Sequence, residues 1–129
     1  MKKLFSLLAG AVLLTACSAE TSSLKGKEYK MLNAPHDAEI TLGFDANEPR
    51  FFGSAAVNRY MGNYKINGDT ISFSNAGVTM MMGPEDLMTV ESEYLQFLDS
   101  VKTYKLDGNV LSLSNGSKTV EYEETAEQH

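Results

Sequence analysis

The chain has 129 residues, a length that suits one domain with its own hydrophobic core. Hydrophobic residues make up 43% of it and charged residues 22%, which is ordinary for a globular protein. The formal net charge is −6. Because an acidic surface repels phosphate backbones, we expect no nucleic-acid partner.

The first 16 residues have the pattern of a secretory signal peptide. Lys2 and Lys3 supply a positive start, and residues 4–14 form an apolar run. That run matches the hydrophobic region of a signal peptide and is too short to span a bilayer as a helix. We therefore expect residues 1–16 to be removed.

The signal peptide ends in Leu14-Thr15-Ala16-Cys17, which resembles the bacterial lipobox. The resemblance implies a lipoprotein whose Cys17 carries acyl chains such as palmitate. Each buried methylene contributes about 0.8 kcal/mol, so two or three chains form a stable membrane anchor. Ser18, in place of an Asp, implies the outer membrane, with the domain facing the periplasm. The alternative is an ordinary signal peptide followed by a coincidental cysteine.

The mature chain begins with a short segment of mostly small and polar residues. Residues 17–27 are expected to be the lipidated N-terminus and a flexible tether, with the domain beginning near Leu24. Without residues 1–16 the chain has 9 Lys and Arg against 17 Asp and Glu, a net charge of −8. This charge disfavours adhesion to anionic lipid, which leaves the acyl chains as the anchor.

Short apolar runs then alternate with turn signals, a pattern typical of β-strands. Asn67-Gly68 between two alternating runs predicts a tight hairpin, and Gly53 is expected at a bulge or a close approach between strands. The candidate strands are residues 28–32, 39–44, 50–56, 60–66 and 70–73, with a further apolar run at 78–82.

One helix is predicted at about residues 85–101. Its apolar residues recur at spacings of three and four, and Pro84 suits the first turn. Glu85 and Asp86 suit the positive end of the helix dipole. The sequence therefore predicts a single amphipathic helix inside a β-rich chain.

Strand periodicity returns after the helix, with turns at Asp107-Gly108 and Asn115-Gly116. Three Asx-Gly turns between short strands predict an antiparallel meander. We expect a mainly β fold with one helix (α+β), closed into a small barrel or a curled sheet, with the helix over an opening or an edge. The domain is expected at residues 28–122, followed by a polar tail at 123–129.

The chain contains, in order, an Asn-Arg-Tyr-x-Gly segment, an Asn-Gly hairpin, a Thr-Met-Met-Met run, a helix ending in Phe-Leu-x-x-Val, and a Tyr-x-Leu-x-Gly-Asn-x-Leu-x-Leu segment. Together these motifs resemble the META domain, the HslJ-type bacterial lipoproteins. The resemblance covers roughly residues 28–122 and implies a lipocalin-like barrel with one helix. It also implies a role in the bacterial envelope, often linked to heat shock or antibiotic stress. The family has no established catalytic site. The matching positions are Asn58, Arg59, Tyr60, Gly62, Thr79, Met81, Met82, Glu91, Leu98, Val101, Tyr104, Leu106, Asn109, Leu111 and Leu113.

The chain departs from many members of that family at two positions. Those members have one cysteine before the Asn and another after the methionine run, whereas this chain has Val57 and approximately Gly83 there. The disulfide implied for those relatives is therefore absent. This puts in doubt any function that needs a redox-active pair.

The sequence gives little support for catalysis. His36 and His129 are the only histidines, and neither takes part in a zinc-binding spacing. Nucleophile-elbow and phosphate-binding glycine motifs are also lacking, and most acidic residues are expected on the solvated surface. We expect a protein that is not an enzyme and that uses no cofactor and no metal.

Two features remain as candidate contacts. The run Met80-Met81-Met82 suggests core packing first, with a soft Cu(I) site or the lining of an apolar ligand site as alternatives. Asn58 and Arg59 lie between apolar runs, where they suggest either a contact with a ligand or partner, or a turn capped by Asn58 with Arg59 paired to an acid.

Two functions from different classes follow. The first is a non-enzymatic envelope lipoprotein that acts through contacts with an unknown envelope protein under stress. The alternative is a lipocalin-like carrier of a small apolar ligand. A barrel interior filled by Phe44, Phe73 and Leu111 would exclude an interior carrier site, whereas a connected apolar cavity of ~300 Å³ or more would favour a carrier.

Overall fold

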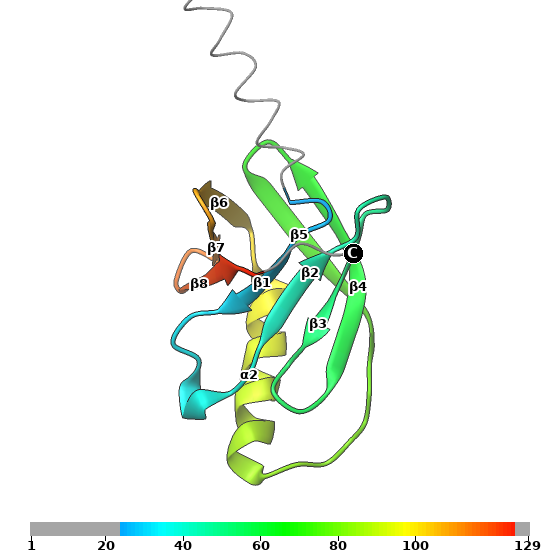
Figure 1. Cartoon of the computed structure of the whole chain (residues 1–129), viewed down its shortest axis with the longest axis vertical. Helices are drawn as coiled ribbons and strands as arrows, with labels where there is room; N and C mark the ends of the chain where they lie inside the picture. The colour runs from blue at the N-terminus through cyan, green and yellow to red at the C-terminus, as the bar shows by residue number, and fades with distance from the viewer. Residues whose placement is uncertain (1–23, 126–129) are drawn as a thin grey trace, which may run out of the picture.

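The computed structural model describes residues 24–125, apart from the side chains of residues 75 and 76. These residues fold into eight strands, one short 3-10 helix and one α-helix (Figure 1). The elements are β1 (Glu28–Met31), η1 (Pro35–Asp37), β2 (Thr41–Phe44), β3 (Arg50–Ser54), β4 (Arg59–Asn67), β5 (Thr70–Val78), α2 (Glu85–Ser100), β6 (Thr103–Asp107), β7 (Val110–Ser114) and β8 (Thr119–Glu124).

The eight strands form a closed antiparallel barrel in which each strand pairs with its neighbours in sequence. The barrel closes where β1 pairs with β8, with Tyr29 opposite Glu124 and Met31 opposite Tyr122. The predicted mainly β fold with one helix is confirmed. The choice between a barrel and a curled sheet is also settled, in favour of the barrel.

The three predicted Asx-Gly turns join consecutive strands. Gly68, Gly108 and Gly116 have φ angles of 67°, 65° and 97°, a region that glycine enters without steric penalty. They join β4 to β5, β6 to β7 and β7 to β8. The hairpin geometry therefore follows directly from the local sequence.

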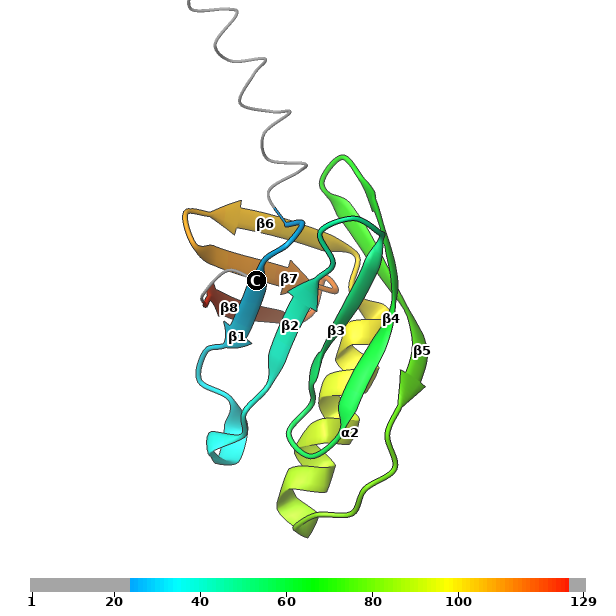
Figure 2. The ribbon, with the colours of Figure 1, turned by 45° about the vertical axis from the view of Figure 1, so that its right-hand side comes forward.

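The barrel is weakest between β5 and β6, where Thr70 opposite Thr103 is the single paired position. The predicted helix is confirmed as α2, which lies between these two strands in sequence and packs against β5 (Figure 2). Residues 70–73, expected as a strand of their own, belong to a longer β5 that ends at Val78. In the run at 78–82, Val78 is therefore the end of β5, and residues 79–82 belong to the connection from β5 to α2.

Side chains fill the interior of the barrel. Phe44 lies edge-on to Tyr64 at 5.1 Å between ring centroids, and Phe51 lies edge-on to Phe73 at the same distance. Leu111 is fully buried beside them in the same core. Within the described residues, this aromatic core fills the interior where a lipocalin-type ligand would lie, as expected for a small barrel whose inward side chains meet.

The described chain begins against the barrel. Leu24 is fully buried, and the Gly26 N–H donates to the Phe44 carbonyl at 2.9 Å. Cys17, the signal peptide, residues 18–23 of the tether and the end of the tail lie outside the described residues, so those expectations stay predictions. Among residues 24–125, no helix is long and apolar enough to cross a bilayer.

Candidate functional site

A buried carboxylate connects α2 to the start of β4. Glu91 is 5% exposed, and it lies on the face of α2 that also buries Tyr94 and Leu98. Its Oε1 accepts the backbone N–H groups of Val57 at 3.0 Å and Asn58 at 2.7 Å. Its Oε2 accepts the Asn58 side-chain amide at 2.7 Å. Three donors thus compensate the burial of one carboxylate.

The other side of Asn58 holds the chain that follows β5. Its Oδ1 accepts the Met81 backbone N–H at 2.6 Å and the Thr79 hydroxyl at 2.8 Å. Its Nδ2 donates to the Met81 carbonyl at 3.1 Å as well as to Glu91. The Asn58 amide therefore pairs with both polar backbone groups of Met81, as a neighbouring strand would.

The two predicted contact residues have different surroundings. Asn58 is 2% exposed and its side chain is used for bonds within the chain, which matches the structural interpretation more closely than the ligand interpretation. Arg59 is exposed at the start of β4, where its backbone pairs with Thr79. Its side chain forms no ion pair with the other described residues, so a role in partner contact stays a prediction.

Sequence reasoning missed Glu91 as a partner of Asn58. The general expectation that acidic residues lie on the solvated surface does not hold for this residue, which is buried. A signal was present, because Glu91 falls at helical spacing among the apolar residues Leu87, Val90 and Tyr94. A charged residue on an apolar helix face indicates a buried partner.

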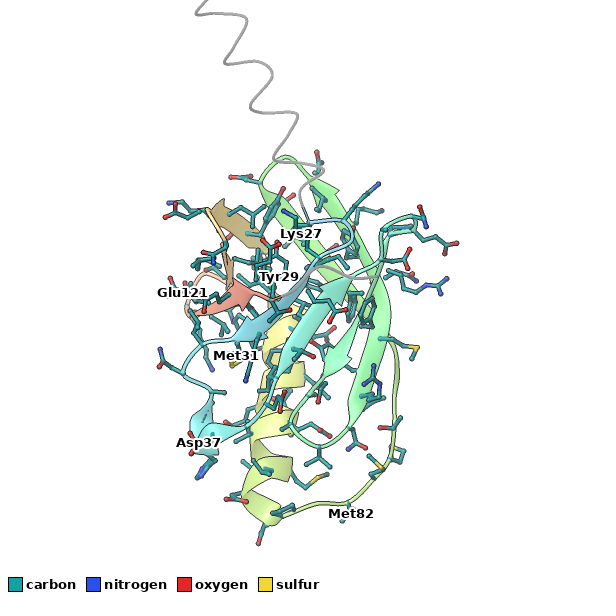
Figure 3. The ribbon with its side chains drawn as sticks, in the orientation of Figure 1. Lys27, Tyr29, Met31, Asp37, Met82 and Glu121 are labelled. Atoms are coloured by element: carbon teal, nitrogen blue, oxygen red, sulfur yellow. The ribbon has the colours of Figure 1, made fainter. Side chains whose placement is uncertain are left out.

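The methionine run does not pack in the core, so the first interpretation of that run is wrong. Met80, Met81 and Met82 are 89%, 55% and 85% exposed. The physical reason is that Asn58 and Thr79 hold this segment through its backbone, so its side chains are not needed for packing. We call residues 79–84 the strap. It runs along the lower edge of the molecule to Met82 and on to α2 (Figure 3).

Three buried tyrosines form a chain of hydrogen bonds between α2 and the barrel. The Tyr60 hydroxyl donates to the Thr41 carbonyl at 2.7 Å, so Tyr94 donates to Tyr60, also at 2.7 Å. Tyr122 donates in turn to Tyr94 at 3.1 Å. Burial raises the pKa of all three hydroxyls well above 10.0, because it disfavours the charged phenolate. The three tyrosines are therefore neutral at physiological pH.

A pocket of about 430 Å³ lies between α2, the β1–β2 connection and the start of β8. Its apolar lining comes from all three segments and includes Met31, Ile40, Val90 and Phe97. The charged side chains that line it are Glu93, Lys118 and Glu121. Met31 and Glu121, labelled on this side of the molecule in Figure 3, come from β1 and β8.

Lys118 lines one part of that pocket, beside Phe97. Its Nζ lies 5.6 Å from the centroid of the Phe97 ring, within the range of a cation–π contact. Glu93 and Glu121 are exposed and form no ion pair with the rest of the described chain. The arrangement can take an apolar body inside and a polar group near the charged side chains.

Val57 and Gly83, which lie at or near the positions where the META resemblance implied a cysteine pair, are adjacent in the structure. A Cβ atom at position 83 would lie 3.6 Å from the Val57 Cβ. That separation falls within the range found in disulfides. In this chain the Val57 side chain instead lies against the strap at Gly83. Within residues 24–125, no group of three or more His, Cys, Asp or Glu side chains is placed to hold a metal ion.

Solved structures of other proteins are similar in fold to this chain. A protein from Burkholderia xenovorans, solved by NMR, is similar with a TM-score of 0.64 and 23% identity over 83% of this chain and 87% of that one. A second NMR structure is similar with a TM-score of 0.60 and 17% identity, over 78% of this chain and 91% of that one. A crystal structure of a duf4847 family protein from Bacteroides vulgatus has a TM-score of 0.52 and 19% identity, over 65% of this chain and 57% of that one.

The fold thus defines the class as a small antiparallel barrel protein. The META domain family model matches residues 14–127, and the chain belongs to that family. No curated protein sequence matches the chain.

Proposed function

We propose that this META-domain protein is a non-enzymatic lipoprotein of the bacterial envelope. It is held at the outer membrane through acyl chains on Cys17, faces the periplasm, and acts through contacts with an envelope protein during heat or antibiotic stress. The single observation that carries the proposal is the sequence Leu14-Thr15-Ala16-Cys17, which follows a positive start and a short apolar run.

The buried polar side chains of the domain are hydrogen-bonded within the chain, which supports a structural role rather than a catalytic one. The buried Glu91 carboxylate is occupied by three internal donors, and the buried tyrosine hydroxyls bond to one another and to Thr41. No buried side-chain nitrogen or oxygen in the described part of the chain lacks a hydrogen-bond partner. A catalytic group, by contrast, is expected to have free capacity toward a substrate.

The test is a comparison of two variants in a bacterial host. The natural chain should fractionate with membranes, and its mass should include the acyl groups on Cys17. Cys17→Ser should lose the membrane fractionation and the added mass, because serine has no sulfur to form the thioether bond to the lipid. Ser18→Ala is the matched control and should behave like the natural chain. Membrane association and lipid mass that persist in Cys17→Ser would refute the proposal.

The pocket beside α2 supports a second candidate, a carrier of a small ligand that is mainly apolar. Its volume of about 430 Å³ falls in the range of ligand sites. Because aromatic side chains fill the barrel interior, the ligand would lie between α2 and β8 rather than inside the barrel. An apolar molecule with one polar group suits the lining.

Two valines allow a matched test of the carrier. Val120 lines the pocket on β8, whereas Val110 on β7 does not, and both are half-buried. Val120→Trp should reduce binding of the neutral dye N-phenyl-1-naphthylamine at least about tenfold, because the indole fills the space. Val110→Trp should leave it unchanged. Equal dye binding by both variants and the natural chain would exclude this pocket as the site.

A further inference from the structure

The strap presents thioethers to solvent on a backbone that is held independently of them. Met80 and Met82 are 89% and 85% exposed, the highest values among the exposed large hydrophobic residues of the described chain. In an extended segment, residues two apart point to the same side. Met80 and Met82 therefore stand outward together, with Met81 between them bonded through its backbone to Asn58.

The bonds that fix the strap involve no methionine side chain. The Thr79 N–H donates to the Arg59 carbonyl at 3.0 Å, and the Arg59 N–H donates to the Thr79 hydroxyl at 3.0 Å. Asn58 adds two bonds to the Met81 backbone and is itself fixed by the buried Glu91 carboxylate. A chemical change at the Met80 or Met82 sulfur therefore leaves every bond of this network in place.

From this geometry we propose that the strap is an oxidation site that reacts with two-electron oxidants, of the peroxide class, at Met80 and Met82 without loss of the fold. The sulfur lone pair attacks one peroxide oxygen, and an S–O bond forms as the O–O bond breaks. The sulfur is oxidised by two electrons, the peroxide is reduced, and the proton of the transferred oxygen passes to the departing hydroxide, which gives the sulfoxide and water.

Two half-buried methionines provide internal references, whereas Met61 and Met81 are 49% and 55% exposed and are not among them. Met31 and Met88 are half-buried, and Met31 lines the pocket beside α2. Oxidant access follows exposure, and a sulfoxide among packed apolar groups disrupts that packing. Oxidation of the strap should therefore be fast and structurally silent, whereas oxidation at Met31 should be slow and destabilising. The surface itself changes from apolar to polar, which alters any contact made there.

The experiment treats the purified full chain with hydrogen peroxide and follows each methionine by peptide mass spectrometry. Met80 and Met82 should oxidise at least about fivefold faster than Met31 and Met88. The melting temperature should stay unchanged when only the strap is oxidised, and methionine sulfoxide reductase should restore the original mass. Comparable rates at all four residues, or a melting temperature that falls with strap oxidation, would overturn the proposal.

Two variants test whether the fast oxidation comes from the strap or from other methionines. Met80→Leu with Met82→Leu should abolish the fast phase while keeping the melting temperature, because both side chains are outside the core. Met31→Leu should keep the fast phase. A fast phase that survives in the double leucine variant would place the reactive thioether elsewhere and refute the assignment.

Discussion

Replacing Glu91 by Gln tests the buried network with a change of one atom. The two oxygens of Glu91 accept three hydrogen bonds, from Val57 N, Asn58 N and Asn58 Nδ2. A glutamine has one acceptor oxygen. If that oxygen keeps the two backbone donors, its NH₂ group faces the Asn58 NH₂ group. A flip of the Asn58 amide moves the mismatch to the Met81 N–H, so no arrangement satisfies every donor.

The expected loss has two parts, the hydrogen bond that is lost and the buried donor that is left without a partner. A hydrogen bond to a charged group contributes about 1.5–3 kcal/mol, and a buried donor without a partner costs about 1–3 kcal/mol. Glu91→Gln should therefore lower the free energy of unfolding by about 2.5–6 kcal/mol. That is a large part of the ~5–15 kcal/mol typical of a domain.

Urea unfolding followed by circular dichroism measures this loss in a chain that has no tryptophan. Glu93→Gln is the matched control on the same helix, because Glu93 is exposed and should change stability by less than about 0.5 kcal/mol. In an Asn58→Ala background the Glu91→Gln loss should shrink by about 1.5 kcal/mol or more, since the facing NH₂ group is gone. A Glu91→Gln variant as stable as Glu93→Gln would refute the network as described.

Three further outcomes are expected. Val57→Cys with Gly83→Cys should form a disulfide that stabilises the oxidised protein by ~3.5 kcal/mol, since it closes a loop of roughly 27 residues; equal urea midpoints with and without reductant would contradict this. Burial raises the pKa of Tyr122 above 10.0, so the unfolded chain loses this proton first and stability falls above about pH 10; Tyr122→Phe should lessen that fall by ~1.4 kcal/mol per pH unit, and an unchanged slope in unfolding titrations would exclude it. Gly53→Ala should destabilise by more than about 2 kcal/mol in thermal unfolding because its Cβ would meet the Thr41 carbonyl, whereas Gly77→Ala, with open space around it, is the tolerant control; equal melting temperatures would count against the close approach.

Local signals accounted for most of the elements. Each Asx-Gly turn specifies a positive φ at its glycine, and the spacing of apolar residues after Pro84 specifies α2, which ends at Ser100. Gly53 was expected at a bulge or a close approach, and it lies against the Thr41 backbone. The META resemblance, expected over roughly residues 28–122, lies within residues 14–127, which the family model matches.

The parts that sequence reasoning missed depend on contacts distant in the chain. Barrel closure pairs β1 with β8, and no local pattern encodes that pairing. Glu91 and Asn58 are 33 positions apart, so neither local sequence indicates that they are hydrogen-bonded. The methionine run was expected in the core because apolar residues usually are. Asn58 bonds its backbone instead, which removes the need for side-chain burial.

The lipid on Cys17 is the central claim of the proposed function, and intact-mass spectrometry of the protein extracted from its own cells tests it most directly. The proposal predicts a mature chain that begins at Cys17 and carries two or three acyl chains. A chain that keeps residues 1–16, or that begins elsewhere without lipid, would contradict it.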